Sequence, residues 1–337
     1  MKHSVKGDYY FVLYIIMKNN WLIFISSTNH SDYNYELDSL KEMQKNLSNN
    51  VTSYVIIFGP RVGTSAQLIK IDKFSWNVIV ECDYPSFNES VKITNFLVKI
   101  LKKHASNSIK SIIFSFHGSS YIVGCPYKKT KIPFMTITDI VKHVITPFKS
   151  IKLVLFDSCY QGSMSCLYEL PDTIKYTIAS PGYHPYHHMT QTKIFGKLDV
   201  VNFSSKESIQ LFANKIVCEW NKIASKINYK CLFVIDNSYL KQIGKLVNER
   251  FDDLVFDKKS VIIKEDKNLN DLYTSARNIP ELQEILTKCV NLKCNKCKNS
   301  VSNIIHGISM ERRLPRKWQS EYKQTKWALF LKKQYQK

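Results

Sequence analysis

The stretch IKLVLFDSCYQG, residues 151–162, decides the fold that the sequence predicts. Its apolar, β-branched first half predicts a buried strand, and Asp157-Ser158-Cys159 ends that strand abruptly. A second run, residues 109–116, has the same design and ends in His117-Gly118. Because sites in open α/β sheets form at the carboxyl ends of strands, the two runs would place an imidazole beside a thiol at one sheet edge.

In the rest of the chain, segments with the sequence pattern of a strand alternate with segments that have the pattern of a helix. Strands are expected at residues 21–26, 51–58, 66–71, 78–81, 109–116, 151–156, 173–179 and 229–235. Helices are expected at residues 36–47, 88–103, 136–144, 163–170, 205–225 and 238–251. Residues 252–305 suggest further helix with irregular loops. This alternation predicts an α/β fold with a mostly parallel sheet covered by helices on both faces.

Length and composition indicate a globular protein with a basic surface. The 337 residues suffice for one large domain or two small ones, and 44% hydrophobic residues argue against disorder. The net charge of +20 would attract nucleic acid, anionic membranes or acidic partners without specificity. An AT-rich coding sequence also explains abundant Lys and Asn, so we predict no specific nucleic-acid partner.

The cysteines and the apolar runs near the N-terminus indicate the cellular compartment of the protein. Nine cysteines at irregular spacing are not a disulfide framework and fit a reducing compartment with mostly buried free thiols. The apolar runs 9–17 and 21–25 are each too short for a bilayer, which needs about 20 residues. No small-residue cleavage site follows them, so a cytoplasmic location is expected and secretion is the open alternative.

Cys159 and His117, which follow the two predicted strands, are the candidate catalytic residues. A thiolate is a strong nucleophile, and a histidine within reach can take its proton and later protonate a leaving amine. Gly118 and Gly162 leave room for backbone N–H groups to approach a substrate carbonyl. Taken separately, a cysteine after an apolar strand is often buried core and a His-Gly pair is often a turn. The pairing of both at strand ends favours catalysis.

A longer series of residues surrounds the cysteine. In order, it reads Phe156-Asp157-Ser158-Cys159, Gly162-Ser163, Tyr168-Glu169-Leu170, Ala179-Ser180, Pro181-Gly182 and Pro185-Tyr186. This series resembles the clostripain-like family of clan-CD cysteine peptidases, and a looser similarity covers about residues 20–290. Caspases match less well, because their Gln-Ala-Cys-x-Gly signature is absent. The resemblance implies a caspase-like three-layer α/β/α sandwich and a cysteine endopeptidase acting on polypeptides.

The resemblance also assigns roles to individual residues. Cys159 would be the nucleophile and His117 the general base and acid. The amides of Gly118 and Cys159 would form the oxyanion hole. Asp157 and Ser180 would line the S1 pocket, where a carboxylate suits a P1 Arg or Lys. By its sequence position alone, Asp157 is equally suited to a turn or helix-cap role.

This chain departs from the family pattern at two positions. Relatives usually have an acid after the Ala-Ser strand and often Asp before His-Gly, where this chain has Pro181 and Phe116. A second S1 carboxylate is therefore not apparent, and cleavage after Arg or Lys is left open. The 181–190 loop carries instead His184, His187 and His188, for which a solvated loop is favoured over a metal site or a substrate wall.

No cofactor is expected to be required. Calcium is implied for some relatives, but no EF-hand-type loop is apparent. The candidate zinc ligands are Cys289, Cys294, Cys297 and His306, and zinc is not favoured because only half of this set has suitable spacing. Some relatives are cut internally after Lys or Arg, for which the candidate bonds here follow Lys128, Lys129 and Lys131.

The expected organisation is an N-terminal extension at residues 1–20, a peptidase domain at residues 21–305 and a basic tail at residues 306–337. A monomer is expected. The alternative function is a catalytically inactive peptidase-like module that binds an acidic partner or nucleic acid through the positive charge.

Overall fold

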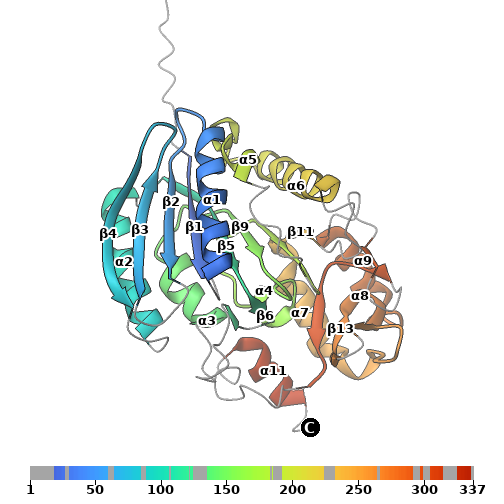
Figure 1. Cartoon of the computed structure of the whole chain (residues 1–337). Helices are drawn as coiled ribbons and strands as arrows, with labels where there is room; N and C mark the ends of the chain where they lie inside the picture. Colours follow the sequence, from blue (N-terminus) through green and yellow to red (C-terminus); the bar gives the residue numbers. More distant parts are fainter. Residues whose placement is uncertain are drawn as a thin grey trace, which may run out of the picture.

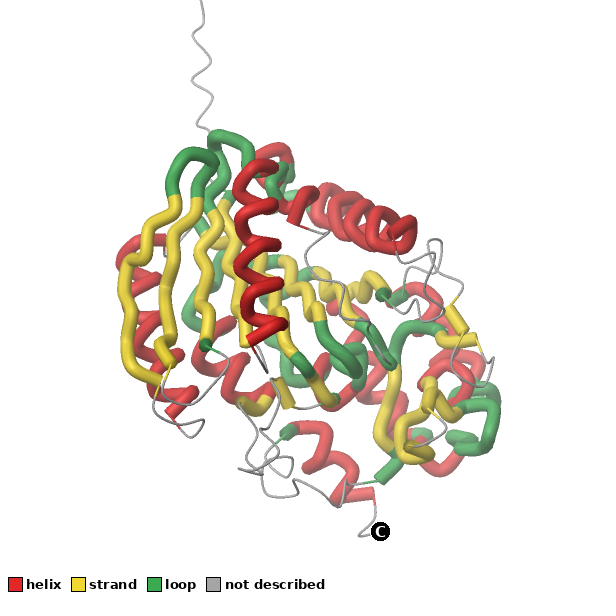
Figure 2. Tube along the Cα trace, viewed as in Figure 1, coloured by secondary structure: helices red, strands yellow, loops and turns green. Residues whose placement is uncertain are grey.

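A central sheet of eight strands organises the molecule (Figures 1 and 2). The computed structural model describes residues 19–26, 30–59, 64–84, 89–105, 108–120, 122–123, 135–182, 184, 192–223, 232–263, 266–290, 297–298, 304–313 and 325–334. The sheet order is β11-β10-β9-β5-β1-β2-β3-β4. Its strands are β1 (Asn20–Ser26), β2 (Ser53–Phe58), β3 (Thr64–Ile71), β4 (Trp76–Tyr84), β5 (Ile109–Phe116), β9 (Leu153–Asp157), β10 (Tyr176–Ala179) and β11 (Phe233–Asp236).

The five central strands are parallel and the outer ones are not. Strands β2, β1, β5, β9 and β10 pair in parallel, whereas β3, β4 and β11 join antiparallel at the two edges. The parallel strands are buried on both faces, which explains why their sequences are continuous apolar runs. The predicted mostly parallel sheet is therefore confirmed.

Helices cover both faces of the sheet (Figure 1). One face packs against α1 (His30–Asn46), α5 (Thr192–Phe195) and α6 (Lys206–Ile223). The other packs against α2 (Ser90–Ala105), α3 (Ile137–Ile140), η2 (Val141–Ile145), α4 (Met164–Leu167), α7 (Leu240–Glu249), α9 (Pro280–Cys289) and α11 (Lys326–Gln334). Alternate residues of β1 face the two cores, with Trp21 and Ile23 on the first side and Leu22 and Phe24 on the second. This is the predicted three-layer α/β/α sandwich.

The region after β11 differs from the prediction. Residues 252–305 were expected to form further helix with irregular loops. They contain α8 (Leu272–Ser275) and α9 but also two strands of a small sheet, β12 (Val261–Ile263) and β13 (Asp266–Asp271), which is completed by β16 (Ser309–Glu311). Further short elements are β6 (Gly118–Ser119), β7 (Ile122–Val123), β8 (Met135–Thr136), β14 (Cys297–Lys298), β15 (Ile304–Ile305), η3 (Leu198–Val200), η5 (Asn237–Tyr239) and η6 (Phe251–Asp253).

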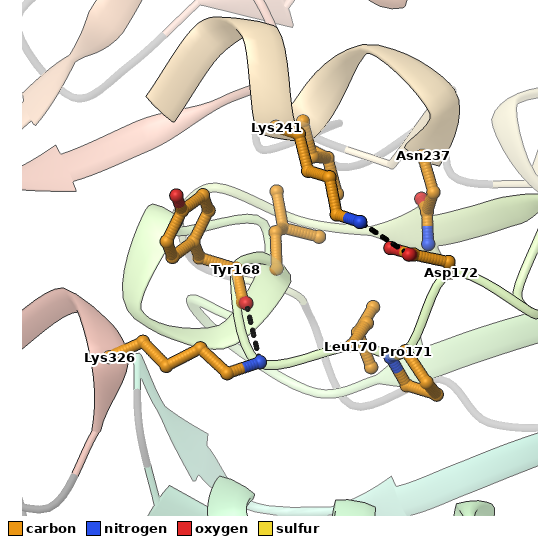
Figure 3. Close-up of a pocket in the computed structure, with 9 residues that line it drawn as sticks. Tyr168, Leu170, Pro171, Asp172, Asn237, Lys241 and Lys326 are labelled. Carbon is orange, nitrogen blue, oxygen red and sulfur yellow. Dashed lines mark hydrogen bonds and ion pairs between the residues drawn. The ribbon is translucent and has the colours of Figure 1, made fainter. Parts of the chain in front are cut away.

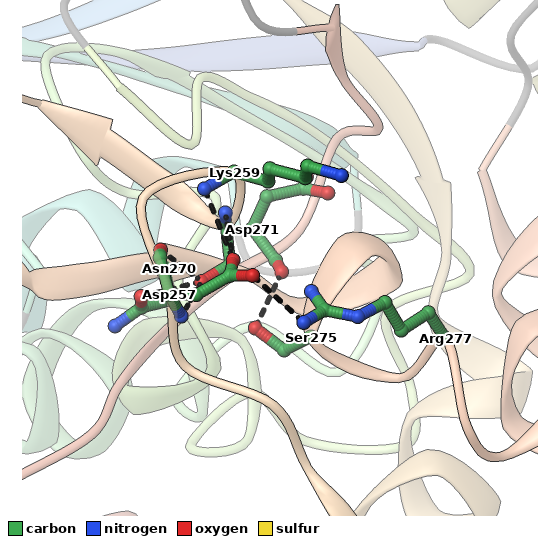
Figure 4. Close-up of polar contacts among 7 residues, drawn as sticks. Asp257, Lys259, Asn270, Asp271, Ser275 and Arg277 are labelled. Carbon is green, nitrogen blue, oxygen red and sulfur yellow. Dashed lines mark hydrogen bonds and ion pairs between the residues drawn. The ribbon is translucent and has the colours of Figure 1, made fainter.

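Side-chain hydrogen bonds satisfy polar groups of Asn270 and Asp271 at the end of β13 (Figure 4). Asp271 caps α8 by accepting from the Thr274 amide at 2.9 Å, and its carbonyl accepts from the Ser275 hydroxyl at 2.9 Å. Ser260 donates to the Asn270 side-chain oxygen at 3.0 Å. Nearby, Asp257 accepts a hydrogen bond from Arg277 at 2.7 Å. Alternation of hydrophobic and polar residues does not reveal a strand whose polar groups are satisfied in this way.

Parts of the expected C-terminal tail belong to the core of the domain. Strand β16 contacts the turn after β9, where the Ser309 amide donates to the Gly162 carbonyl at 3.0 Å. Helix α11 packs on α4 (Figure 1), with Trp327 only 1% exposed, and the Lys326 amide donates to the buried Glu169 carboxylate. A boundary at residue 306 therefore does not separate these segments from the peptidase domain.

Most of the cysteines that the structure describes are free thiols, as expected, and one is not. Cys82, Cys159, Cys166 and Cys289 are free, but Cys218 on α6 is disulfide-bonded. Such bonds are uncommon in reducing compartments. Among the residues with described structure, no helix is long and apolar enough to cross a membrane.

The packing of α11 gives a stability prediction. Trp327→Ala removes a buried indole, so we expect a loss of about 3–5 kcal/mol in the free energy of unfolding. Leu329→Ala on the same helix is the control, because Leu329 is 52% exposed and its truncation should change stability by no more than about 0.5 kcal/mol. Urea denaturation measures both, and equal small effects would show that α11 does not belong to the core.

Candidate active site

The cysteine at the end of β9 lies in a tightly held turn. Tyr160, directly after Cys159, has φ of 63°, a left-handed conformation that costs a residue with a side chain about 1–2 kcal/mol. Two backbone hydrogen bonds to the segment that follows β10 fix the turn. The Tyr160 amide donates to the Gly182 carbonyl at 2.8 Å, and the Gly162 amide donates to the Ser180 carbonyl at 2.7 Å. Surrounding bonds of this kind keep a strained turn in place, as is common at functional sites.

The strand register brings His117 to the same edge as Cys159. Strands β5 and β9 pair in parallel with Ser115 opposite Asp157, so His117 and Cys159 each follow two residues later. His117 is exposed, which suits a group that exchanges protons with a bound substrate. His117 and Cys159, the pair predicted from the sequence, therefore follow two neighbouring strands at the same level of the sheet.

Gly118 passes very close to the nucleophile turn. A Cβ atom at Gly118 would lie 2.9 Å from the Cys159 carbonyl oxygen and 2.8 Å from Nε2 of the buried Gln161. The first of these is backbone, which cannot move aside cheaply. The glycine is therefore required by the close approach of the two strand ends, as the predicted oxyanion-hole role also requires.

The Cys159 thiol contacts the backbone of His184. The His184 amide donates to Sγ at 3.3 Å, and the thiol lies 3.4 Å from the His184 carbonyl oxygen, to which it donates. Burial raises the pKa of the Cys159 thiol, the His184 amide opposes this rise, and the charge of Asp157 adds to it. The net effect favours the neutral thiol, so formation of the thiolate depends on a base.

Asp157 is buried and paired with a histidine that was expected in a solvated loop. His184 Nε2 lies 2.5 Å from Asp157 Oδ1, and the two side chains are 2% and 1% exposed. The imidazole stacks on Trp220 of α6 with ring centroids 5.0 Å apart and an interplanar angle of 23°. The solvated-loop expectation is therefore wrong for His184. His187 and His188 lie outside the described residues.

A second buried carboxylate, missed in the sequence, lies on the same face of the sheet. Glu36 of α1 is fully buried and accepts from the Ser115 hydroxyl at 3.0 Å. Since Ser115 is the register partner of Asp157, their side chains leave the same face of strands about 4.8 Å apart. Burial raises the pKa of Tyr35, and the charges of Glu36 and then Asp157 add to the rise, which places Tyr35 near both acids.

The signal for Glu36 was present in the helical pattern. Glu36 precedes the buried residues Leu40, Met43 and Leu47 at intervals of four, three and four, which is the core-facing stripe of α1. A charged residue in line with an apolar stripe indicates either a paired buried group or a functional one.

Ser180 shapes the backbone beneath the site. It is fully buried, and its hydroxyl donates to the Gly182 carbonyl at 3.1 Å. The Gly162 amide in turn donates to the Ser180 carbonyl. Ser180 therefore supports the bend that leads to His184, and its predicted contact with substrate stays a prediction.

Two of the four candidate zinc ligands have other partners. The buried Cys289 donates to the Asp236 carbonyl at 3.3 Å, and burial raises the pKa of its thiol. His306 Nδ1 lies 3.0 Å from Asp271 Oδ2. Cys297 begins the short strand β14, and Cys294 lies outside the described residues, as do Lys128, Lys129 and Lys131. Within the described part of the chain, no three metal-binding side chains gather in one place.

A cavity of about 260 Å³ lies where the segment after α4 meets α7 and α11 (Figure 3). It is lined by residues from the end of α4, from α7 and from the start of α11, including Tyr168, Asp172, Lys241 and Lys326. Lys241 pairs with Asp172, and Lys326 donates to the Tyr168 carbonyl at 3.4 Å. Neither His117 nor Cys159 lines this cavity, so it is distinct from the predicted S1 pocket.

Solved structures of cysteine proteases share this fold. A secreted C11 cysteine protease from Bacteroides thetaiotaomicron in complex with an irreversible peptide inhibitor is 17% identical, with a TM-score of 0.68 over 93% of this chain and 99% of the other. A secreted C11 cysteine protease from that organism, iotapain, is 16% identical, with a TM-score of 0.69 over 94% of this chain and 99% of the other. An inactive zymogen C11 protease from Parabacteroides distasonis is 14% identical, with a TM-score of 0.67 over 93% and 98%. No curated protein sequence matches the chain.

This likeness shows the fold, a caspase-like α/β/α sandwich in which the ends of β5 and β9 meet at one edge of the sheet. Residues 23–313 match the model of the clostripain family, which covers most of the chain. The chain belongs to the clostripain family, as the Cys159 series indicated, and it acts on polypeptides.

The tight passage at Gly118 gives a prediction for catalysis. Gly118→Ala forces a Cβ against the Cys159 carbonyl, so we expect peptidase activity to fall by about 100-fold or more, the cost of losing one oxyanion donor. Gly182→Ala is the control, because its Cβ would meet only the end of the Ile262 side chain at 3.2 Å. Peptide hydrolysis by the two purified variants measures the difference, and normal activity in Gly118→Ala would contradict the prediction.

The raised pKa of Cys159 gives a prediction for pH dependence. The thiolate is the reactive form, so alkylation of Cys159 by iodoacetamide should accelerate with pH through a midpoint above the ordinary value of about 8.5. Peptide mapping by mass spectrometry follows the modification of this one cysteine. A midpoint below the ordinary value would mean that the thiol is held as a thiolate by a positive neighbour.

Proposed function

We propose that Cys159 and His117 form the catalytic dyad of this peptidase. His117 takes the thiol proton, and the Cys159 sulfur forms a bond to the scissile carbonyl carbon. The tetrahedral intermediate collapses as the C–N bond breaks, and His117 gives its proton to the leaving amine. Water then attacks the thioester with His117 as base, which releases the acid and restores the thiol. The observation that carries the proposal is the β5–β9 register, which brings both residues to one edge.

The Gly118 and Cys159 amides are the proposed donors to the oxyanion. Support comes from the contact between the two strand ends, because the Gly118 backbone lies against the nucleophile turn without room for a side chain. Donors fixed by backbone geometry need no reorganisation as negative charge develops on the substrate oxygen. The strained and bonded conformation of Tyr160 contributes to this rigidity.

The proposed P1 preference is Arg or Lys. It is supported by two buried acids on one face of the sheet, Asp157 on β9 and Glu36 on α1. The family acid after the Ala-Ser strand is replaced by Pro181, and Glu36 offers a carboxylate from another element. A cationic side chain that leaves water needs such partners. That no cofactor is required, a monomeric state and a cytoplasmic location remain predictions, and the disulfide at Cys218 weighs against the last.

The dyad is tested with variants of each member. Cys159→Ala should abolish hydrolysis of fluorogenic peptides with Arg or Lys at P1, and His117→Ala should lower kcat by about 100- to 10,000-fold. His104→Ala at the exposed end of α2 is the matched control and should retain full activity.

Labelling by an acyloxymethyl ketone with Lys at P1 gives a second readout. The label should appear on Cys159 in the wild-type protein and be absent from Cys159→Ala. Hydrolysis that persists in Cys159→Ala would overturn the assignment. Salt-dependent retention of nucleic acid without any labelling would favour the inactive binding module.

A further inference from the structure

We infer that His184 is a specificity-determining residue that lies, in this structure, where the P1 residue of a substrate would lie. The inference rests on the proposed roles of Cys159 and Asp157. It adds a role for His184, a residue to which the proposed function gives none. It follows from the contacts of one amino acid with three separate elements: β9, the nucleophile turn and α6.

The side chain of His184 occupies the position of a P1 side chain. Its Nε2 meets Asp157 Oδ1 at 2.5 Å, in a contact almost fully shielded from water. Asp157 is the acid proposed to receive a basic P1 group. One face of the imidazole is covered by Trp220, itself 3% exposed, so the ring fills a closed space between β9 and α6. A planar nitrogen-containing ring here imitates a guanidinium in both its stacking and its pairing with a carboxylate.

The main chain of His184 occupies the position of a P1 main chain. Its carbonyl oxygen lies 3.4 Å from Cys159 Sγ and its amide nitrogen 3.3 Å. In a substrate, the P1 carbonyl has to lie next to this sulfur while the P1 side chain enters the pocket. A single residue that contacts the nucleophile through its backbone and the specificity acid through its side chain satisfies both conditions at once.

The consequence is competition for Asp157. A substrate with Arg or Lys at P1 has to displace the imidazole from Asp157 and Trp220 before its own side chain can pair with the carboxylate. A small reagent that only needs the sulfur does not have to displace it. Removal of the imidazole should therefore favour reagents with a basic P1 group selectively.

His184→Ala tests this competition. We expect second-order labelling of Cys159 by the Lys-containing acyloxymethyl ketone to rise about tenfold or more, because a stacked and hydrogen-bonded occupant is lost. Labelling by iodoacetamide should change by less than about threefold, because this reagent does not use the pocket. His104→Ala is again the matched control, since it removes an exposed histidine far along the chain.

Chemical rescue separates an occupant from a merely structural residue. Free imidazole should enter the space vacated in His184→Ala and slow labelling by the Lys reagent, and it should not slow labelling of the wild-type protein. If the alanine variant unfolds, His184→Gln keeps a donor for Asp157 without the aromatic ring and should give an intermediate gain.

The outcomes distinguish this inference from the proposed function. If the Lys reagent labels Cys159 in both proteins and no faster in His184→Ala, then His184 is a fixed wall of the pocket, and the inference is wrong while the dyad stands. If Cys159 reacts with neither reagent in any variant, the proposed function fails and the inference fails with it. A faster, imidazole-sensitive reaction of His184→Ala confirms it.

Discussion

The parallel register between β5 and β9 is the constraint on which the rest of the site depends. With Ser115 opposite Asp157, the residues of the proposed site are fixed by counting along two strands: Asp157 and Ser115 lie on one face, and His117 and Cys159 lie beyond the last pair. A slip of one residue would turn Asp157 to the opposite face and separate the thiol from the imidazole by one step. The apolar residues that lock this register, from Ile112 to Phe116 and from Leu153 to Phe156, are buried in the two cores.

Burial of charge shapes the edge of the sheet near Cys159. Glu36 and Asp157 are both removed from water on the same face, and each is paired with a polar side chain, Ser115 or His184. Two unpaired carboxylates this close would repel each other and would be poorly solvated. The imidazole of His184 therefore meets a physical requirement of the closed space around Asp157, and in the proposed binding mode a cationic P1 group replaces it because it meets the same need.

The sequence predicted the parts of the structure that rest on local pattern. The strand 109–116 agrees with β5 residue for residue, and Cys159, His117 and Gly118 lie just beyond strand ends as expected, whereas their catalytic roles stay predictions. The partner of Asp157 could not be predicted, because His184 reaches it across 27 residues and only the fold decides which loop histidine turns inward. For the same reason, the tryptophan of α11 gave no sign that it would be buried: Lys332 and Lys333 make the segment appear to be a basic tail. Glu36 is the one missed residue whose position in a helical stripe was visible beforehand.

The thiol and its pocket are coupled through Asp157. Its charge raises the pKa of Cys159, while the amide of His184, anchored by the same aspartate, lowers it. In the proposed binding mode, a basic P1 side chain that replaces His184 brings its own positive charge to Asp157 and so offsets the charge that disfavours the thiolate. Binding of a basic P1 side chain thus promotes ionisation of the nucleophile at the moment when a carbonyl carbon lies beside it. On this proposal, discrimination between substrates and activation of Cys159 are two effects of one carboxylate.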